Sequence, residues 1–246
     1  ALLNDIVGAS QTTDVDTIAE INELARIANA IQQTAAGQTP SPALTPADLA
    51  KVGLSGVTAD NLTAVLNAIA AQADNGSATD SLPELQAVIN TAATAYANAL
   101  DAISAAAEGN SATTTSPSAQ QYADAGVSGV TSANLAAIND ALNSAPVNGA
   151  AADTAAEVQA IVNAYNKILS AADGTDSNAT ATPTAGDYAA IGVTGVDAAT
   201  AALLSDVIDG KPTDAVDTVA EVQALADAAR AVLGYDDPAT DTAPTK

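Results

Sequence analysis

Residues 153–160 read Asp-Thr-Ala-Ala-Glu-Val-Gln-Ala, and the chain contains four variants of this octet. In each variant a Ser or Thr is followed three residues later by Glu. This spacing is typical of a capping box, in which the hydroxyl accepts the amide of the third helical residue and the carboxylate accepts the amide of the cap residue. The pattern therefore predicts four helix starts, at Thr17 with Glu20, Ser81 with Glu84, Thr154 with Glu157, and Thr218 with Glu221.

A second motif lies between successive capping boxes. It reads Gly-x-[Ser/Thr]-Gly-Val and occupies residues 53–57, 126–130 and 192–196. Glycine adopts the left-handed conformation that ends many helices, and an apolar residue commonly follows it. The motif therefore predicts that a short helix ends at its first glycine, which is Gly53, Gly126 or Gly192.

The two motifs alternate in a fixed order, which is the pattern of a tandem repeat. The box glutamates are 64, 73 and 64 residues apart, and apolar residues follow each box at helical spacing. We predict an all-α, elongated tandem array of three-helix units, each with a long, a short and a medium helix. The expected boundaries are 1–12 for the end of a preceding unit, 13–76, 77–149 and 150–213 for three units, and 214–246 for the first helix of a further unit.

Two further positions describe the inside of a unit. Tyr122 and Tyr188 occupy the place that Leu49 has in the first unit, and interchange with Leu predicts a role in the core. Thr58 and Thr131 are predicted to cap the third helix. Because a unit of about 65 residues buries only enough surface to be marginally stable alone, we expect contacts between units, mainly between neighbours.

Composition removes most classes of enzyme. The 246 residues contain no His, Cys, Met, Phe or Trp, so the usual general base and thiolate nucleophile are absent, and we expect no catalytic residues. The net charge of −23 excludes nucleic acid as a partner, because polyanions repel each other. No apolar run is long enough to predict insertion of this segment into a membrane.

The only cofactor that the sequence leaves open is Ca²⁺. Asp173, Asp176 and Asn178 lie close together in one loop and could contribute oxygen ligands, although no segment matches a spaced calcium loop. An Asp also precedes every capping box, at Asp16, Asp80, Asp153 and Asp217. We interpret these four as carboxylates favoured by the helix dipole rather than as metal ligands.

Taken together, the motif Tyr-Ala-x-x-Gly-Val-[Ser/Thr]-Gly-Val, the Asn-Leu-Ala helix after it and the octet Asp-Thr-x-Ala-Glu-Val-Gln-Ala resemble the helical repeats of large bacterial surface proteins. These are adhesins and biofilm-associated proteins, often exported by type I secretion. The resemblance covers nearly the whole chain. It implies a secreted, extracellular location on the bacterial cell surface and a structural role, as a stalk or spacer that projects an adhesive domain.

Two alternative functions stay open. One is a self-assembling subunit of a surface layer or extracellular filament, which an apolar face left uncovered by the chain's own helices would favour. The other is a ligand-binding or Ca²⁺-stiffened helical module, which stabilisation by Ca²⁺ would favour. If the chain is a spacer or a self-assembling subunit, its expected partners are neighbouring repeat units or copies of the same chain.

Overall fold

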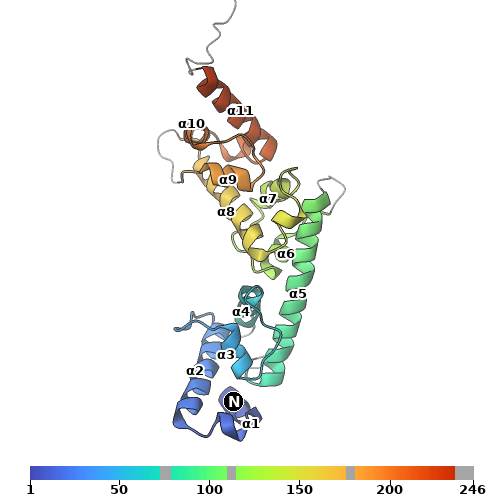
Figure 1. The fold of residues 1–246 in the computed structure, drawn as a ribbon, viewed down its shortest axis with the longest axis vertical. Coiled ribbons are helices and arrows are strands. Elements are labelled where there is room, and N and C mark those ends of the chain that lie inside the picture. The colour runs from blue at the N-terminus through green and yellow to red at the C-terminus, as the bar shows by residue number, and fades with distance from the viewer. Residues whose placement is uncertain (73–78, 110–114, 176–180, 236–246) are drawn as a thin grey trace, which may run out of the picture. The chain divides into compact units, whose positions relative to one another are not determined.

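A computed structural model describes residues 1–72, 79–109, 115–175 and 181–235, and these residues are helical with no strand (Figure 1). The all-α prediction is therefore confirmed for this part of the chain. The α-helices are α1 Leu2–Ala9, α2 Ile18–Ala35, α3 Pro46–Lys51, α4 Leu62–Ala70, α5 Leu82–Gly109, α6 Ala119–Asp124, α7 Leu135–Leu142, α8 Ala155–Ala171, α9 Ala185–Ala190, α10 Ala198–Asp209 and α11 Val219–Tyr235. Short 3₁₀ helices occupy Thr12–Asp14 (η1), Gly149–Ala151 (η2) and Thr213–Ala215 (η3). None of the described helices is both long and apolar enough to cross a membrane.

The chain divides into two bodies. The first contains residues 1–99 and 123–126, and the second contains residues 100–122 and 127–246. Two of the three division points fall inside helices, α5 and α6, so each of these helices contributes residues to both bodies.

The core of the first body forms around α2, which lies against α1, α3 and α4 (Figure 1). Ile27 and Ile31 of α2 are fully buried and belong to one apolar cluster with Leu49 of α3 and Ile69 of α4. The start of α5 adds Leu85 to the same cluster. Leu, Ile, Val and Ala fill this core, which is why helical spacing of these residues was visible in the sequence.

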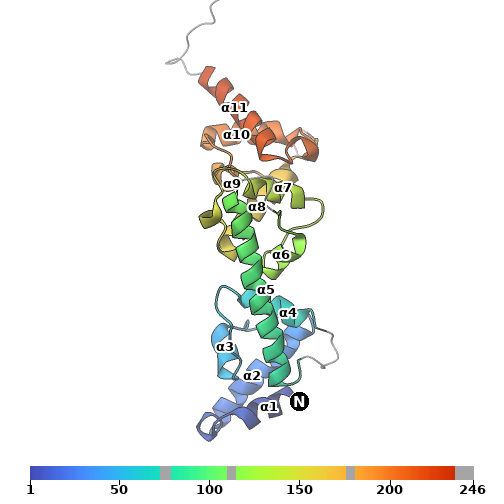
Figure 2. The ribbon, with the colours of Figure 1, turned by 90° about the vertical axis from the view of Figure 1, so that its right-hand side faces the viewer.

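The second body has three fully buried tyrosines, and α8 lies beside α9 and α10 within it (Figure 2). The hydroxyl of Tyr122 donates to Oδ1 of Asn139 at 2.8 Å, and Nδ2 of Asn139 donates to the carbonyl of Pro117 at 2.9 Å. A buried phenol normally needs such a partner. The equivalent Tyr188 lies 3.3 Å from Oγ of Ser205, which donates to the carbonyl of Pro183.

In the first body, leucines occupy all three positions of this hydrogen-bonded group. Leu49, Leu66 and Leu44 stand at the positions of Tyr122, Asn139 and Pro117. Leu44 and Leu49 are buried, and Leu66 packs against the same core. The interchange of Tyr and Leu therefore preserves a core position, as predicted, while its hydrogen-bonding partners change with it.

Two helix boundaries differ from the predictions. The regular helices α4 and α7 begin at Leu62 and Leu135, after Asn61 and Asn134, rather than directly after Thr58 and Thr131. The asparagine closes a turn first: Oδ1 of Asn61 accepts the amide of Thr58 at 2.8 Å, and its Nδ2 donates to the carbonyl of Gly56 at 2.9 Å. The predicted threonine caps belong to this turn.

Helix α5 is 28 residues long, against 18 for α2 and 17 for α8. Its closing Gly109 lies further from the box glutamate than Gly174 lies from Glu157. The longer spacing between the second and third boxes therefore arises mostly inside this helix, as about three additional turns.

Candidate functional site: glutamine bridges and the adjoining groove

The predicted capping residues meet in the structure. The amide of Glu157 donates to Oγ1 of Thr154 at 3.2 Å, and the amide of Thr154 donates to Oε2 of Glu157 at 3.1 Å. Thr17 with Glu20 and Thr218 with Glu221 have the same pair of bonds. At the fourth position the amide of Glu84 donates to Oγ of Ser81 at 3.4 Å, and that hydroxyl lies 2.7 Å from Oε2 of Glu84.

In two of the boxes the preceding Asp and the cap glutamate shift each other's pKa. A hydrogen bond with Glu157, and then the charge of that residue, raises the pKa of Asp153 above its ordinary value. The Thr154 hydroxyl lowers the pKa of Glu157 in turn. Asp16 and Glu20 show the same opposite shifts, with the Glu20 hydrogen bond as the largest cause for Asp16 and the Thr17 hydroxyl for Glu20. At Asp16 and Asp153 the preceding Asp is thus held beside a carboxylate whose pKa the cap lowers.

Each Gly-x-[Ser/Thr]-Gly motif forms the same turn. The first glycine has a positive φ, for example +75° at Gly126 and +92° at Gly192, which is the left-handed conformation predicted for a helix end. The following residue reaches back to the short helix, as when the amide of Val127 donates to the carbonyl of Tyr122 at 2.9 Å. Gly53, the first glycine of the earliest motif, has φ +85°.

A glutamine from the next long helix bridges each turn. Oε1 of Gln159 accepts the amide of Ser128 at 2.8 Å, and Nε2 donates to the carbonyl of the same serine at 3.1 Å. Its second amide hydrogen points to Oδ1 of Asn163, one helical turn further on, at 2.9 Å. The side-chain amide thus pairs with both backbone groups of one residue, as a neighbouring strand would.

The same bridge occurs three times. Gln86 binds Ser55 at 2.9 and 3.0 Å, and Gln223 binds Thr194 at 2.8 and 3.2 Å. The paired residues are separated by 31, 31 and 29 positions along the chain. These contacts were not predicted from the sequence, although a glutamine recurs two residues after each of the last three box glutamates and was the available signal.

A second long-range contact skips the intervening long helix. Oδ2 of Asp5 in α1 accepts the amide of Leu82 at the start of α5 at 2.6 Å. This bond joins two helices that α2 separates along the chain. Oδ2 of Asp140 in α7 accepts the amide of Val219 at the start of α11, also at 2.6 Å, and passes over α8. A carboxylate near the first amides of a helix is favoured by the helix dipole. Contacts mainly between neighbouring units were expected, and these reach further.

Basic side chains hold two of the short helices. Nζ of Lys167 in α8 lies 2.8 Å from Oδ2 of Asp187, and Arg26 of α2 pairs with Asp48. Burial of the Asp187 carboxyl acts to raise its pKa, but the bonds from Lys167 and Thr184 outweigh it, and the pKa is lowered. Half-buried ion pairs of this kind attach the short helix to the long helix before it.

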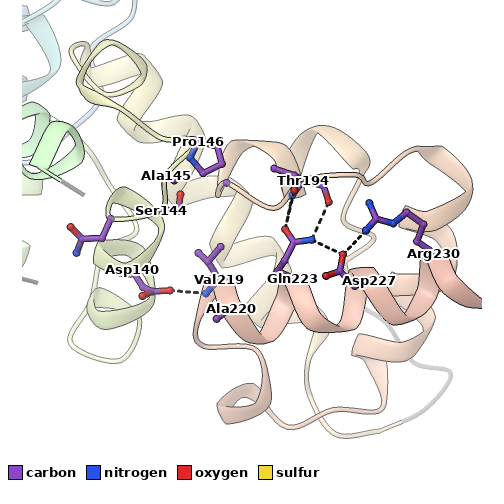
Figure 3. Close-up of a pocket in the computed structure, with 12 residues that line it drawn as sticks. Asp140, Ser144, Ala145, Pro146, Thr194, Val219, Ala220, Gln223, Asp227 and Arg230 are labelled. Carbon is purple, nitrogen blue, oxygen red and sulfur yellow. Dashed lines mark hydrogen bonds and ion pairs between the residues drawn. The ribbon is translucent and has the colours of Figure 1, made fainter. Parts of the chain in front are cut away.

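A groove adjoins the third bridge, at α7, α11 and the turn between α9 and α10 (Figure 3). It has a volume of about 630 Å³ and is lined by Asp140, Pro146, Val219, Ala220, Gln223, Asp227 and Arg230 among others. Its charged groups bond to the protein itself: Asp140 accepts the Val219 amide, and Asp227 accepts both Gln223 and Arg230. The groove is therefore the rim of a structural joint in which side chains tie helices together.

The calcium candidates do not form a described site. Asp173 is exposed, and its Oδ1 accepts the amide of Thr175 at 2.9 Å. Asp176 and Asn178 lie outside the described residues. Among the residues that are described, no group of three or more acidic, His or Cys side chains is arranged to hold a metal ion.

Comparison of the chain with models of protein families, with curated proteins and with solved structures found no match. The recurrence of motifs and contacts inside the chain itself is therefore the basis for a functional argument.

Proposed function

We propose that this chain is a set of structural spacer repeats from an extracellular bacterial surface protein, with no catalytic activity of its own. In this proposal each unit contains a long, a short and a medium helix. The units follow one another in single file and hold an adhesive domain away from the cell surface.

The observation that carries the proposal is the threefold glutamine bridge. Gln86, Gln159 and Gln223 each bind the turn that closes the preceding short helix, with nearly equal distances. A joint that recurs at a constant position within each repeat is expected of an array in which units contact their neighbours in sequence. A globular enzyme domain has no need of the same joint three times.

The contacts that skip a long helix suit a spacer as well. Asp140 of α7 accepts the first amide of α11, so that joint links two helices that α8 separates along the chain. Such overlap resists bending at a single junction, which favours a spacer over a chain of freely hinged units. The net charge of −23 favours the same shape, since like charges repel least when they are spread along a rod.

Small-angle X-ray scattering tests this proposal. A compact globule of this length would have a radius of gyration of roughly 18 Å, and single-file units should clearly exceed it. The value should be extrapolated to zero protein concentration so that association of chains does not contribute. A radius of gyration at the compact value would refute the spacer.

A further inference from the structure

Four large apolar side chains are exposed among the described residues, and two of them share one helix start. Ile18 of α2 is 79% exposed and Ile21 is 41% exposed. The residues equivalent to Ile21 in the three later long helices are completely buried, and they are Leu85, Val158 and Val222. The residues equivalent to Ile18 are half-buried, and they are Leu82, Ala155 and Val219. The start of α2 therefore exposes two apolar side chains whose equivalents in the later long helices are half-buried or fully buried.

Val207 of α10 is another of the four exposed apolar side chains. It is 37% exposed, whereas the equivalent Ile6 of α1 and Ala141 of α7 are 1% and 0% exposed. Asp206, which precedes it, is exposed and is equivalent to Asp5 and Asp140. The apolar residue after this Asp is therefore buried in α1 and α7 and exposed in α10, whereas the Asp itself is exposed in α1 and half-buried in α7.

Inside the chain these two kinds of surface meet. Asp140 accepts the amide of Val219, which is equivalent to Ile18, and α7 also contacts α11. Asp5 makes the same bond to the amide of Leu82. The same contact, an Asp that accepts the first amide of a later long helix, thus occurs twice inside the chain.

We propose that Asp206 and Val207 of one copy dock on Ile18 and Ile21 of a second copy. Every chain carries both parts, on α10 and on the start of α2, and each part is exposed in the structure. The Asp206 carboxylate of one copy accepts the Ile18 amide of the next, as Asp140 accepts that of Val219. The occupant of both surfaces is another copy of this chain.

This contact uses different surfaces on the two partners. Such a head-to-tail contact leaves one surface of each kind free at the ends of every complex, so copies add in a line unless the geometry closes a ring. The net charge of −23 opposes association, and added salt therefore strengthens it by screening. Association of copies is separate from the spacer proposal, since a monomeric chain can still be a spacer.

Sedimentation equilibrium of the full chain tests the proposal, from micromolar to millimolar concentration and at low and high salt. The expected average mass rises above the monomer mass of 23.9 kDa with concentration, and rises further in high salt. A mass that stays at the monomer value under all these conditions refutes the proposal, and would assign these surfaces to a different partner.

Variants at the two surfaces distinguish head-to-tail contact from other modes. Ile18→Asp places a charge opposite Asp206 and should weaken association at least tenfold, while Asp at a first helical position leaves the helix dipole satisfied. The matched control is Ala19→Asp, because Ala19 and its equivalents Pro83, Ala156 and Ala220 are all exposed. This control should associate like the parent chain.

The partner surface has its own variant. Asp206→Lys should abolish association alone, yet associate when mixed with Ile18→Asp, since the two charges then attract each other. If Asp206→Lys associates like the parent while Ile18→Asp does not, copies meet through α2 alone and the head-to-tail contact is wrong. Circular dichroism of each variant checks that its helix content is that of the parent.

Discussion

The glutamine bridge makes a prediction that can be tested at single atoms. Gln159 accepts the amide of Ser128 and donates to its carbonyl. Gln159→Glu keeps the acceptor and removes both donors, and it places a carboxylate opposite the carbonyl oxygen. Gln159→Ala removes everything. The two variants therefore separate the halves of the bridge.

We expect a cost of about 1–2 kcal/mol for either variant, because each loses hydrogen bonds that contribute about 0.5–1.5 kcal/mol apiece and the site is partly open to solvent. For a chain of this length that corresponds to a fall in Tm of roughly 2–8 °C. The Gln159→Glu variant should recover part of this loss on acidification, because a protonated carboxyl can donate to the Ser128 carbonyl again.

Hydrogen exchange supplies the sharper measurement. Ser128 is an exposed residue, and its amide is bonded to Oε1 of Gln159. Its amide should exchange quickly in Gln159→Ala and stay protected in Gln159→Glu. The charge control is Gln32→Glu, at an exposed position on α2. If Gln159→Glu melts like Gln32→Glu, and Ser128 exchanges equally in both Gln159 variants, the bridge does not hold the turn in solution.

Three further outcomes are expected. Asp153→Asn should raise the Tm at neutral pH by removing repulsion from the neighbouring cap glutamate; since the folded pKa of Asp153 is raised, the parent chain gains stability as pH falls through that pKa, and thermal melts should show the advantage shrinking there. Gly192→Ala should destabilise more than Gly53→Ala in chemical denaturation, because both have a positive φ but only at Gly192 does the added Cβ meet a serine side chain, whereas nothing lies within 4 Å at Gly53. Tyr122→Phe should cost about 1–3 kcal/mol by leaving the buried Oδ1 of Asn139 without its donor, and the double change Tyr122→Phe with Asn139→Leu, which removes the buried amide at nearly constant volume, should cost less than the single change if the buried amide is the cause.

The buried Tyr122 shows what the sequence pattern could and could not predict. Comparison with Leu49 predicted that Tyr122 lies in the core, and it is completely buried. Burial raises its pKa well above the usual range for a phenol. The hydrogen bond to Asn139 was not predicted, because 17 residues and two turns separate the partners and nothing local indicates that they meet.

The sequence by itself determined the helix class, the starts of the long helices and the turns that end the short ones. These features depend on residues within one helical turn of each other, such as Thr154 and Glu157, so they can be predicted from the local sequence. The same locality explains the difference at Thr58 and Thr131, where an asparagine three residues later accepts the threonine amide in a turn and the regular helix begins after that asparagine.

Tertiary structure alone decided which helix faces meet. Gln159 could have faced solvent, and Asp140 could have capped nothing, since neither has a sequence neighbour that requires its contact. Their partners lie 31 and 79 residues away, and the contacts exist only because packing of the buried faces brings those backbone groups within reach. Burial fixes the orientation of each helix, and the polar joints follow from that orientation.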